Sequence, residues 1–322
     1  MSELAQKVKA SVDRIKSFAS LTENFADDGT TGYYLAFSGG KDSVAVKALM
    51  DMAGVKYDAH YRVTSVDPPE LVRFIKDTYP DVQFEIPRYP GEWNEEAGNY
   101  NRGKQITMWN LIPKKLMPPT RVVRYCCKHL KESGGDGRMT VTGVRWAESV
   151  NRAKNQGVVT ITDKKAGREL GDDVNFMSTG RGGVVLVNDN SESRQVLDAC
   201  VTRHKTCLNP MIEWTDADVW EFIRSENIPY CGLYDDGWHR LGCVGCPMAR
   251  KHGREREFAR WPRFKLAYIK AFERMLEERK RRGKNHGWMN ANDVFNWWME
   301  YDELFGQYSM FEEYEELEND RT

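Results

Sequence analysis

The stretch Tyr33-Tyr34-Leu35-Ala36-Phe37-Ser38-Gly39-Gly40-Lys41-Asp42-Ser43 decides the fold, together with the run Val44-Ala45-Val46-Lys47-Ala48-Leu49-Met50 that follows it. Residues 33–37 form a short apolar run, which is typical of a strand buried in a parallel sheet. Residues 44–50 carry good helix formers. We therefore predict a strand, a glycine-rich turn and a helix. The turn would lie at the carboxyl end of the strand, where open α/β sheets place their active sites.

The turn at residues 38–43, called the phosphate loop below, has the chemistry of an anion site. Its two glycines let backbone N–H groups approach phosphate oxygens, and the following helix directs its positive dipole at the same point. Lys41 adds a mobile positive charge, Ser38 and Ser43 can donate hydrogen bonds, and Asp42 could engage Mg²⁺ or orient the loop. The Walker spacing is absent. The competing interpretation is a plain glycine turn with incidental Ser and Lys.

Further apolar runs extend the pattern on the carboxyl side of the loop. Residues 57–63, 82–86 and 139–145 are predicted strands, and residues 69–79 are a predicted helix that opens after a proline pair. This alternation predicts an α/β fold with an open, mostly parallel, doubly wound sheet. Arg145 would then lie at the same edge of the sheet as the phosphate loop.

The sequence also predicts how the chain is divided. Residues 1–30 are expected to hold an N-terminal helix, because apolar side chains recur every three or four positions over 3–27. Residues 31–250 would form the nucleotide-binding domain. It would carry an insertion near 150–195, where two β-like runs suggest a hairpin or flap. Residues 251–322 are expected to be a helical C-terminal region.

Composition restricts the class of protein. The 322 residues include 47 Lys and Arg against 48 Asp and Glu, so the net charge of -1 predicts no general attraction to polyanions. No window approaches the roughly 18 consecutive apolar residues of a membrane span, and the polar N-terminus lacks a signal-peptide core. We expect a soluble, cytoplasmic protein with no membrane partner. The seven cysteines are an odd number, which disfavours a secreted, fully paired framework.

Four of the cysteines form two tight pairs, Cys126-Cys127 and Cys243-Val244-Gly245-Cys246. Four thiolates suit either Zn²⁺ or an iron–sulfur cluster. Adjacent cysteines favour the cluster, because neighbouring side chains diverge and reach different irons more readily than one tetrahedral zinc. Zinc and unrelated buried cysteines remain the alternatives. The basic neighbours Arg124, Lys128, His129 and Lys131 would stabilise thiolates or an anionic substrate.

The remaining cysteines, Cys200, Cys207 and Cys231, have no partner spacing. We interpret them as packing residues. The alternative for Cys207 or Cys231 is a redox-active sulfur carrier.

A phosphate loop followed by Cys-Cys and later by Cys-x-x-Cys is similar to the phosphoadenosine/adenosine phosphosulfate reductase family of PP-loop (N-type) ATP pyrophosphatases. Residues 142–145, 209–220, 233–234 and 240–243 also match. The resemblance implies an adenine nucleotide alpha hydrolase-like fold and a [4Fe-4S] cluster on the four paired cysteines, beside the nucleotide site. It also implies a phosphate or sulfate group held by Lys41, Arg145, Lys128 and Arg240.

Two departures point away from sulfonucleotide reduction. No cysteine follows Cys246, whereas the reductases carry a nucleophilic cysteine on a late Glu-Cys-Gly-type segment. The phosphate loop is intact, whereas it tends to be degenerate in reductases, whose substrate lacks the β- and γ-phosphates of ATP. The combination looks like the ATP-hydrolysing sulfur-transfer subunit of DNA phosphorothioation systems and its phage relatives.

We therefore expect an ATP pyrophosphatase that adenylylates an acceptor in a sulfur-transfer reaction. Lys41, Asp42 and Arg145 would be catalytic, residues 38–43 with Arg145 and Arg240 would bind ATP and Mg²⁺, and the cluster would handle sulfur or shape the site. Expected partners are a cysteine desulfurase or other sulfur donor, DNA or RNA, and a second copy of the chain. The alternatives are a sulfonucleotide reductase and a non-catalytic, nucleotide-sensing nucleic-acid-binding protein.

Aromatic and apolar residues recur at helical spacing over 258–275 and again over 288–298. They predict core packing of this helical region against the main domain. The alternative is a nucleic-acid platform, since basic residues such as Arg274, Arg279 and Arg282 are interleaved with the aromatic rings.

Overall fold

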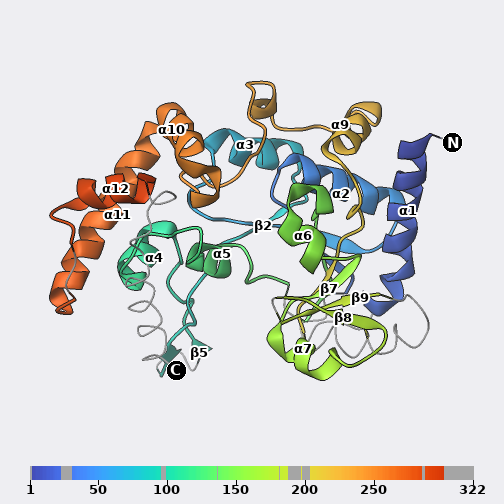
Figure 1. The fold of residues 1–322 in the computed structure, drawn as a ribbon, viewed down its shortest axis with the longest axis horizontal. Helices are drawn as coiled ribbons and strands as arrows, with labels where there is room; N and C mark the ends of the chain where they lie inside the picture. The colour runs from blue at the N-terminus through green and yellow to red at the C-terminus, as the bar shows by residue number, and fades with distance from the viewer. Residues whose placement is uncertain are drawn as a thin grey trace. The chain divides into compact units, whose positions relative to one another are not determined.

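In the computed structural model, strand β1 (Tyr33–Ala36) is an inner strand of an eight-stranded sheet (Figure 1). The strand order is β3 (Gln83–Glu85), β2 (Tyr57–Arg62), β1, β6 (Thr140–Val141), β10 (Thr206–Leu208), β7 (Val159–Ile161), β9 (Val184–Leu186) and β8 (Phe176–Ser178). The pairs from β3 to β10 are parallel, and the pairs from β10 to β8 are antiparallel. The predicted fold class, an open and mostly parallel α/β sheet, is confirmed.

The strands predicted within the insertion are part of this sheet. β7 pairs with β10, and β9 pairs with both β7 and β8, so the insertion extends the parallel sheet with an antiparallel edge. A hairpin or flap was the expectation from its sequence, and the pairing shows that these short runs continue the main sheet.

The structure describes residues 2–22, 31–95, 99–135, 137–180, 182–187, 197, 204–284 and 287–300. The chain forms two compact units. Unit 1 comprises Met1–Val63, Pro69–Ile86 and Ser133–Gly242, and it contains the sheet. Unit 2 comprises Thr64–Pro68, Pro87–Glu132 and Cys243–Thr322. Each unit is described by itself below.

Unit 1 surrounds its sheet with six α-helices among the described residues: α1 (Glu3–Ser17), α2 (Lys41–Ala53), α3 (Pro69–Thr78), α6 (Val150–Asn155), α7 (Lys164–Leu170) and α9 (Asp216–Ser225). It also has the short 3₁₀ helices η1 (Ala19–Thr22), η2 (Trp146–Glu148) and η3 (Gly232–Tyr234). The predicted N-terminal helix exists as α1. It ends at Ser17, ten residues before the end of the apolar pattern over 3–27, and residues 23–30 lie outside the described part.

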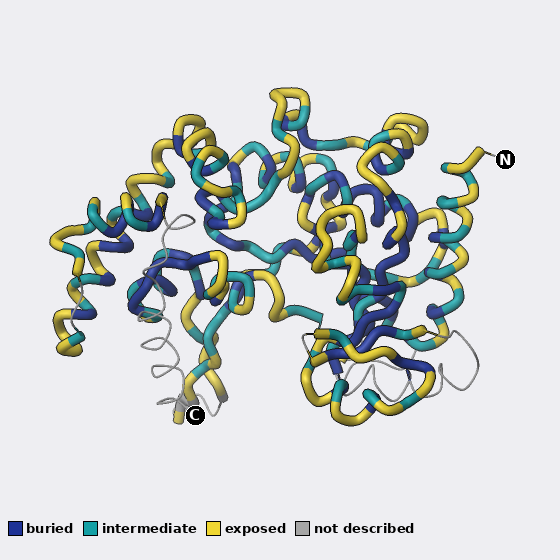
Figure 2. Tube along the Cα trace, viewed as in Figure 1, coloured by how far each residue is buried: buried dark blue, intermediate teal, exposed yellow. Residues whose placement is uncertain are grey.

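The core of unit 1 forms where β1 meets α2. Tyr33, Leu35 and Phe37 are buried, and they alternate along the strand as one face of a sheet requires. Figure 2 shows buried residues gathered along the strands and the helix sides that face them. α2 ends at Ala53, and the φ of 65° at the next residue, Gly54, lets the chain turn sharply there. This packing fixes the phosphate loop between a buried strand and a buried helix.

The other face of the same strands carries an ionic network. The His60 ring forms ion pairs with Asp58 and Glu85, and it stacks on the Tyr34 ring with centroids 4.2 Å apart. Arg138 also binds Asp58 through Nη1, at 3.0 Å. Burial by itself would lower the pKa of His60, but the hydrogen bonds to the two carboxylates outweigh it and raise the pKa to about 9.

We expect this network to make stability depend on pH. Because the folded pKa of His60 is about 9 and its ordinary value is 6.5, the stabilisation is fully present below pH 6.5 and is lost as the pH rises through about 9. The free energy of unfolding, measured by urea titration from pH 6 to 10, should fall over that window. His60→Gln should flatten the fall, whereas His252→Gln, at an exposed histidine, should leave it unchanged. Equal pH profiles for wild type and His60→Gln would contradict this account.

Unit 2 is mainly helical. It contains α4 (Met108–Lys115), α5 (Tyr125–Leu130), α10 (Arg250–Arg260), α11 (Pro262–Arg281) and α12 (Ala291–Glu300), with the short helix η4 (Pro247–Ala249) and a hairpin of β4 (Trp93–Asn94) and β5 (Asn99–Tyr100). α11 packs against α4, α10 and α12. Phe258, Tyr268, Phe272, Met275 and Trp298 are all buried, so these side chains form a core within unit 2. Packing of this region against the main domain stays a prediction.

No helix in the described ranges has both the length and the apolar character that a membrane crossing requires.

Candidate functional site

The phosphate loop needs its first glycine. Gly39 has a φ of +73°, and a Cβ atom there would lie 2.7 Å from the Ile75 side chain. Only glycine satisfies both conditions without strain. Gly40 then precedes α2 as its N-cap residue, and it offers no side chain to cap the helix. The start of α2 therefore presents backbone N–H groups without the usual side-chain acceptor.

Four charged side chains form a closed ring at the start of α2. Lys41 Nζ lies 3.0 Å from Asp42 Oδ2 and 3.1 Å from Asp216 Oδ1. Arg145 Nε lies 2.8 Å from Asp42 Oδ1, and Arg145 Nη2 lies 2.5 Å from Asp216 Oδ1. Each cation thus contacts both carboxylates. The ring joins the phosphate loop, the segment after β6 and the first residue of α9.

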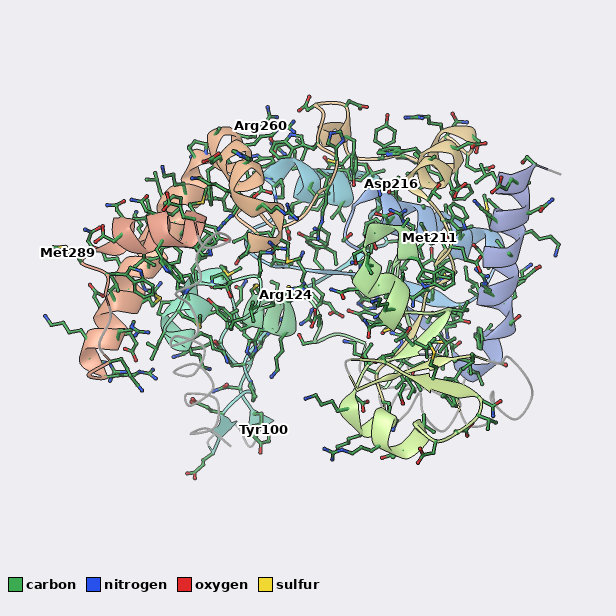
Figure 3. The ribbon with its side chains drawn as sticks, viewed as in Figure 1. Tyr100, Arg124, Met211, Asp216, Arg260 and Met289 are labelled. Atoms are coloured by element: carbon green, nitrogen blue, oxygen red, sulfur yellow. The ribbon has the colours of Figure 1, made fainter. Side chains whose placement is uncertain are left out.

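The ring is buried on one side and open on the other. The side chain of Arg145 is 1% exposed and that of Lys41 is 7% exposed, whereas the side chain of Asp216 is 71% exposed. Figure 3 labels Asp216 at the start of α9. Partial burial would raise the pKa of Asp216, but the hydrogen bonds from Arg145 and Lys41 outweigh it and lower the pKa. An incoming anion could reach the cations by exchanging with this exposed carboxylate.

The hydroxyl groups of Ser38, Ser43 and Tyr234 also lie at the phosphate loop. Ser43 Oγ donates to the Gly40 carbonyl at 2.8 Å, and Ser38 Oγ lies 3.2 Å from Ser43 Oγ. The backbone N–H of Lys41 donates to the Tyr234 hydroxyl at 2.8 Å. Burial raises the pKa of Tyr234, so this phenol stays protonated.

The structure brings together some of the sequence-predicted residues and adds two more. Lys41, Asp42 and Arg145 share one network, as expected for one edge of the sheet. Arg240 is exposed and is not a member of that network. Sequence reasoning missed Asp216 and Tyr234. Both lie within segments that match the family pattern, residues 209–220 and 233–234, but neither segment indicates that its side chain reaches the phosphate loop.

The four paired cysteines lie together in unit 2. Cys126 and Cys127 lie in the first turn of α5, and their thiols hydrogen-bond one another. The charges of Cys243 and Cys246 act on Cys126 and raise its pKa further. The buried phenol of Tyr268 is close enough to Cys126, Cys243 and Cys246 for all three to raise its pKa, although its own burial is the larger cause. Two segments far apart in the sequence thus converge in one place.

Basic side chains from the α5 region face these sulfurs. Arg124, labelled in Figure 3, donates from Nη2 to Cys127 Sγ at 3.2 Å. The hydrogen bond from Cys126 and the charge of Arg124 overcome burial and lower the pKa of Cys127. Burial raises the pKa of Cys243 to about 12. Lys131 hydrogen-bonds the Cys243 thiol, and its positive charge acts to lower this pKa but does not outweigh burial. Lys131 is therefore placed to offset charge if Cys243 is deprotonated by a metal.

Backbone contacts hold the 243–246 loop in place. Gly245 has a φ of +76°, and a Cβ atom there would lie 2.8 Å from both Phe258 and Tyr268. Its N–H donates to Glu257 Oε2 at 2.6 Å. The Tyr268 hydroxyl donates to the Val244 carbonyl at 3.0 Å. The two cysteines are thus presented from a loop that is fixed on both sides.

The donor set can be compared with the requirements of a metal centre. A single Zn²⁺ needs its ligands to converge on one point about 2.3 Å from each sulfur. Among the described residues, no group of three or more His, Cys, Asp or Glu side chains converges in that way. A cluster takes each thiolate on a different iron. Four cysteine sulfurs are the right number and kind of donor for either group.

The other cysteines have a different environment. Burial raises the pKa of Cys207, in β10, to about 11, and burial also raises the pKa of Cys231. The thiol form is favoured in both, as expected for packing residues. Cys200 lies outside the described residues.

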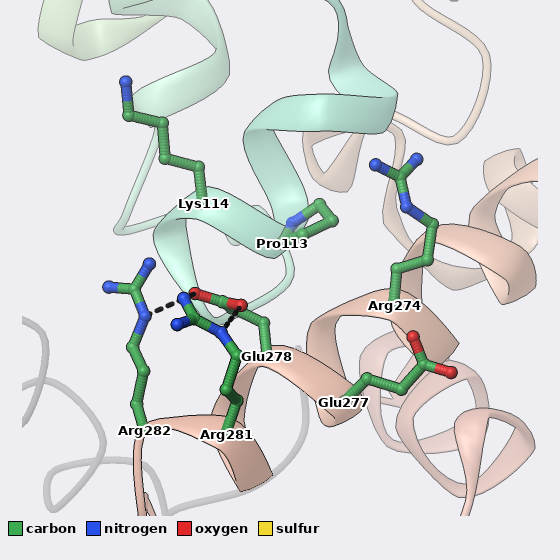
Figure 4. Close-up of a pocket in the computed structure, with 7 residues that line it drawn as sticks. All are labelled: Pro113, Lys114, Arg274, Glu277, Glu278, Arg281 and Arg282. Carbon is green, nitrogen blue, oxygen red and sulfur yellow. Dashed lines mark hydrogen bonds and ion pairs between the residues drawn. The ribbon is translucent and has the colours of Figure 1, made fainter.

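A hollow of about 470 Å³ in unit 2 lies between α4 and α11 and contains none of the residues predicted to bind ATP or a metal (Figure 4). It is lined by Pro113, Lys114, Arg274, Glu277, Glu278, Arg281 and Arg282. Glu278 pairs with both Arg281 and Arg282, at 2.5 Å in each case. Those two arginines are therefore neutralised in part by their own helix.

With this geometry established, comparison with known proteins gives the family. The family model for the phosphoadenosine phosphosulfate reductase domain matches residues 32–249. This chain belongs to that family. The matched range contains the phosphate loop, the four ring residues and the four paired cysteines.

Individual relatives in the family are distant. The adenosine 5'-phosphosulfate reductase of Oceanobacillus iheyensis is 23% identical over 216 residues, which span 66% of this chain and 66% of that protein. An uncharacterized 37.8 kDa protein of Escherichia phage 186 is 33% identical over 84 residues, which span 26% of this chain and 25% of that protein. The chain thus spans slightly less than two thirds of the reductase that it matches.

Among solved structures, the phosphoadenylyl-sulfate reductase of Candida auris is 13% identical to this chain, with a TM-score of 0.38. The match covers 76% of this chain and 96% of that chain.

Proposed function

We propose that this chain is an ATP pyrophosphatase of the PP-loop type that adenylylates an acceptor in a sulfur-transfer reaction. The observation that carries the proposal is the pair of buried cations, Lys41 and Arg145, at the helix start that follows Gly39 and Gly40. Buried cations beside the backbone N–H groups of a helix N-terminus form a site for a polyphosphate. The carboxylates that now balance these cations would be exchanged for phosphate oxygens.

The chemistry follows from charge development in the transition state. An acceptor oxygen attacks the α-phosphorus of ATP, the bond between that phosphorus and the bridging oxygen to the β-phosphate breaks, and pyrophosphate leaves with the electron pair. Lys41, Arg145 and the N–H groups of α2 would stabilise the growing negative charge of the leaving group. Because these groups are fixed before the substrate arrives, they would also orient it. A sulfur nucleophile could then displace AMP from the adenylylated acceptor.

Asp42 and Asp216 supply the oxygen ligands that Mg²⁺ prefers. A phosphate oxygen that pairs with Lys41 and Arg145 would release one carboxylate from the ring, and the exposed Asp216 is the easier one to release. We propose that the released carboxylate would help to hold Mg²⁺, which would offset the negative charge of the phosphates.

Cys126, Cys127, Cys243 and Cys246 are the residues that would hold a [4Fe-4S] cluster, with zinc as the alternative metal. Such a cluster, when bound, supplies iron and sulfide for sulfur or electron chemistry. The chain itself contributes four sulfurs, with Arg124 and Lys131 beside Cys127 and Cys243. The acceptor would be DNA or RNA and the sulfur donor a cysteine desulfurase, as the resemblance to phosphorothioation subunits suggests.

A second candidate, a sulfonucleotide reductase, is favoured by the adenosine 5'-phosphosulfate reductases among the relatives. The two functions use different substrates, so paired assays separate them. We expect ATP with Mg²⁺ to yield AMP and pyrophosphate, and adenosine 5'-phosphosulfate with thioredoxin to yield no sulfite. Sulfite release without ATP cleavage would favour the reductase. ATP binding without turnover, together with salt-dependent nucleic-acid binding, would favour a nucleotide sensor.

A further inference from the structure

The Tyr234 hydroxyl lies at the phosphate site although it comes from a distant segment. It accepts the Lys41 backbone N–H at 2.8 Å, across 193 positions of the chain. A Cβ atom added to Gly40 would lie 3.4 Å from the same oxygen. The phenol therefore occupies the helix start where the N-cap residue Gly40 provides no side-chain acceptor. This is the end of α2 to which an anion would be drawn.

Packing fixes the position of the phenol. Tyr234 ends η3, and its N–H donates to the Cys231 carbonyl at 3.1 Å. The Trp220 ring meets the Tyr234 ring edge to face, with centroids 5.0 Å apart and planes at 84°. The Tyr230 ring belongs to the same aromatic cluster, with its centroid 6.4 Å from that of the Tyr234 ring. Because two aromatic rings and a 3₁₀ turn hold it, the hydroxyl is a fixed feature of the site.

The hydroxyl has a hydrogen left to donate. A phenol that accepts one hydrogen bond through its oxygen can still donate its own O–H. When a hydroxyl group accepts one hydrogen bond, that bond polarises its O–H and strengthens the hydrogen bond that the O–H donates. Burial keeps this phenol protonated, as its raised pKa shows, so the donating form is present throughout the neutral range.

We infer that Tyr234 is a substrate-binding residue whose hydroxyl donates a hydrogen bond to the pyrophosphate portion of ATP while it accepts from Lys41 N–H. The inference rests on the proposed function, because it takes ATP as the ligand of the loop. It extends the phosphate site beyond residues 38–43 and Arg145, to a side chain on the segment that follows α9. AMP, which lacks the β- and γ-phosphates, would not make this contact.

Isothermal calorimetry with Mg²⁺ and three probes, ATP, inorganic pyrophosphate and AMP, tests the inference. Tyr234→Phe removes the hydroxyl and keeps the ring, and it should weaken binding of ATP and pyrophosphate about tenfold or more, as expected for a hydrogen bond to a charged group. AMP binding should stay unchanged. Tyr230→Phe is the matched control, because the Tyr230 hydroxyl bonds Asp235 within the same cluster of rings and should affect none of the three.

The outcomes separate the inference from the proposed function. If wild type binds ATP and pyrophosphate, and Tyr234→Phe binds them equally or more tightly, the inference is overturned and the proposed function stands. An equal loss in Tyr230→Phe, or an equal loss of AMP binding in Tyr234→Phe, would show a structural effect and would also overturn the inference. Wild-type protein that binds neither ATP nor pyrophosphate would overturn both.

Discussion

Replacing Lys41 with methionine is expected to lower the rate of ATP cleavage by at least about a hundredfold, the usual cost of removing one preorganised charge from a transition state. Methionine fills much of the same space but cannot pair with a phosphate. The change also leaves Asp42 and Asp216 with Arg145 as their only remaining cation in the ring, so they would repel an incoming anion. The rate of pyrophosphate release under saturating ATP measures the effect.

Lys56→Met is the matched control for this variant. Lys56 is exposed in the same unit and lies outside the ring, so its replacement should leave the rate within about twofold, as for most surface changes. Thermal unfolding of both variants would show whether the fold is kept. Similar rates for Lys41→Met and wild type would remove the phosphate loop from the reaction.

Cys243→Ser is expected to abolish most cluster binding. Cys243 is half-buried beside Lys131, and serine is a poor ligand for iron in a site built for thiolates. Iron and sulfide content and the visible absorbance after anaerobic purification should drop to a small fraction of the wild-type values. This readout does not depend on ATP turnover, so it tests the cysteine centre by itself.

Cys207→Ser provides the comparison for the cysteine centre. Cys207 lies in β10 of the sheet, where burial favours its thiol form, and it is not a member of either cysteine pair. Its replacement should leave the iron and sulfide content unchanged. Equal iron loss in the two variants, or zinc as the metal of the wild-type protein, would contradict the cluster assignment.

Local sequence was enough to predict the strand, turn and helix around the phosphate loop. The apolar run at 33–37, the paired glycines and the helix formers at 44–50 each favour the observed conformation without help from distant residues. The placement of Arg145 followed from a general property of parallel sheets, whose carboxyl ends share one edge. These features depend on patterns a few residues long, which a single sequence contains in full.

Asp216 could not be predicted in its role because its partner Lys41 is 175 positions away. Locally, the segment from Thr215 signals a helix start, and Thr215 does cap α9 together with Asp218. Capping uses Asp218, which leaves Asp216 free to reach the ring. Nothing in the spacing distinguishes the two carboxylates.

Unit 2 depends even more on distant contacts. The Trp298 indole donates to the Pro119 carbonyl at 2.6 Å across 179 positions, and this bond ties α12 to the segment before α5. α4 and α5 have only 8 and 6 residues, and α4 contains Pro113, so neither gives a clear helical period.

The domain boundaries at residues 30 and 250 stay a prediction.

Product analysis of α-labelled ATP tests the central claim most directly. The labelled nucleotide is incubated with anaerobically purified protein and Mg²⁺, with and without DNA or RNA as acceptor. The account predicts that label appears in AMP or in the adenylylated acceptor, with an equal amount of pyrophosphate, and that Lys41→Met forms neither. Labelled ADP with free phosphate, or labelled ATP that stays intact with every acceptor while sulfite is released from adenosine 5'-phosphosulfate, would contradict it.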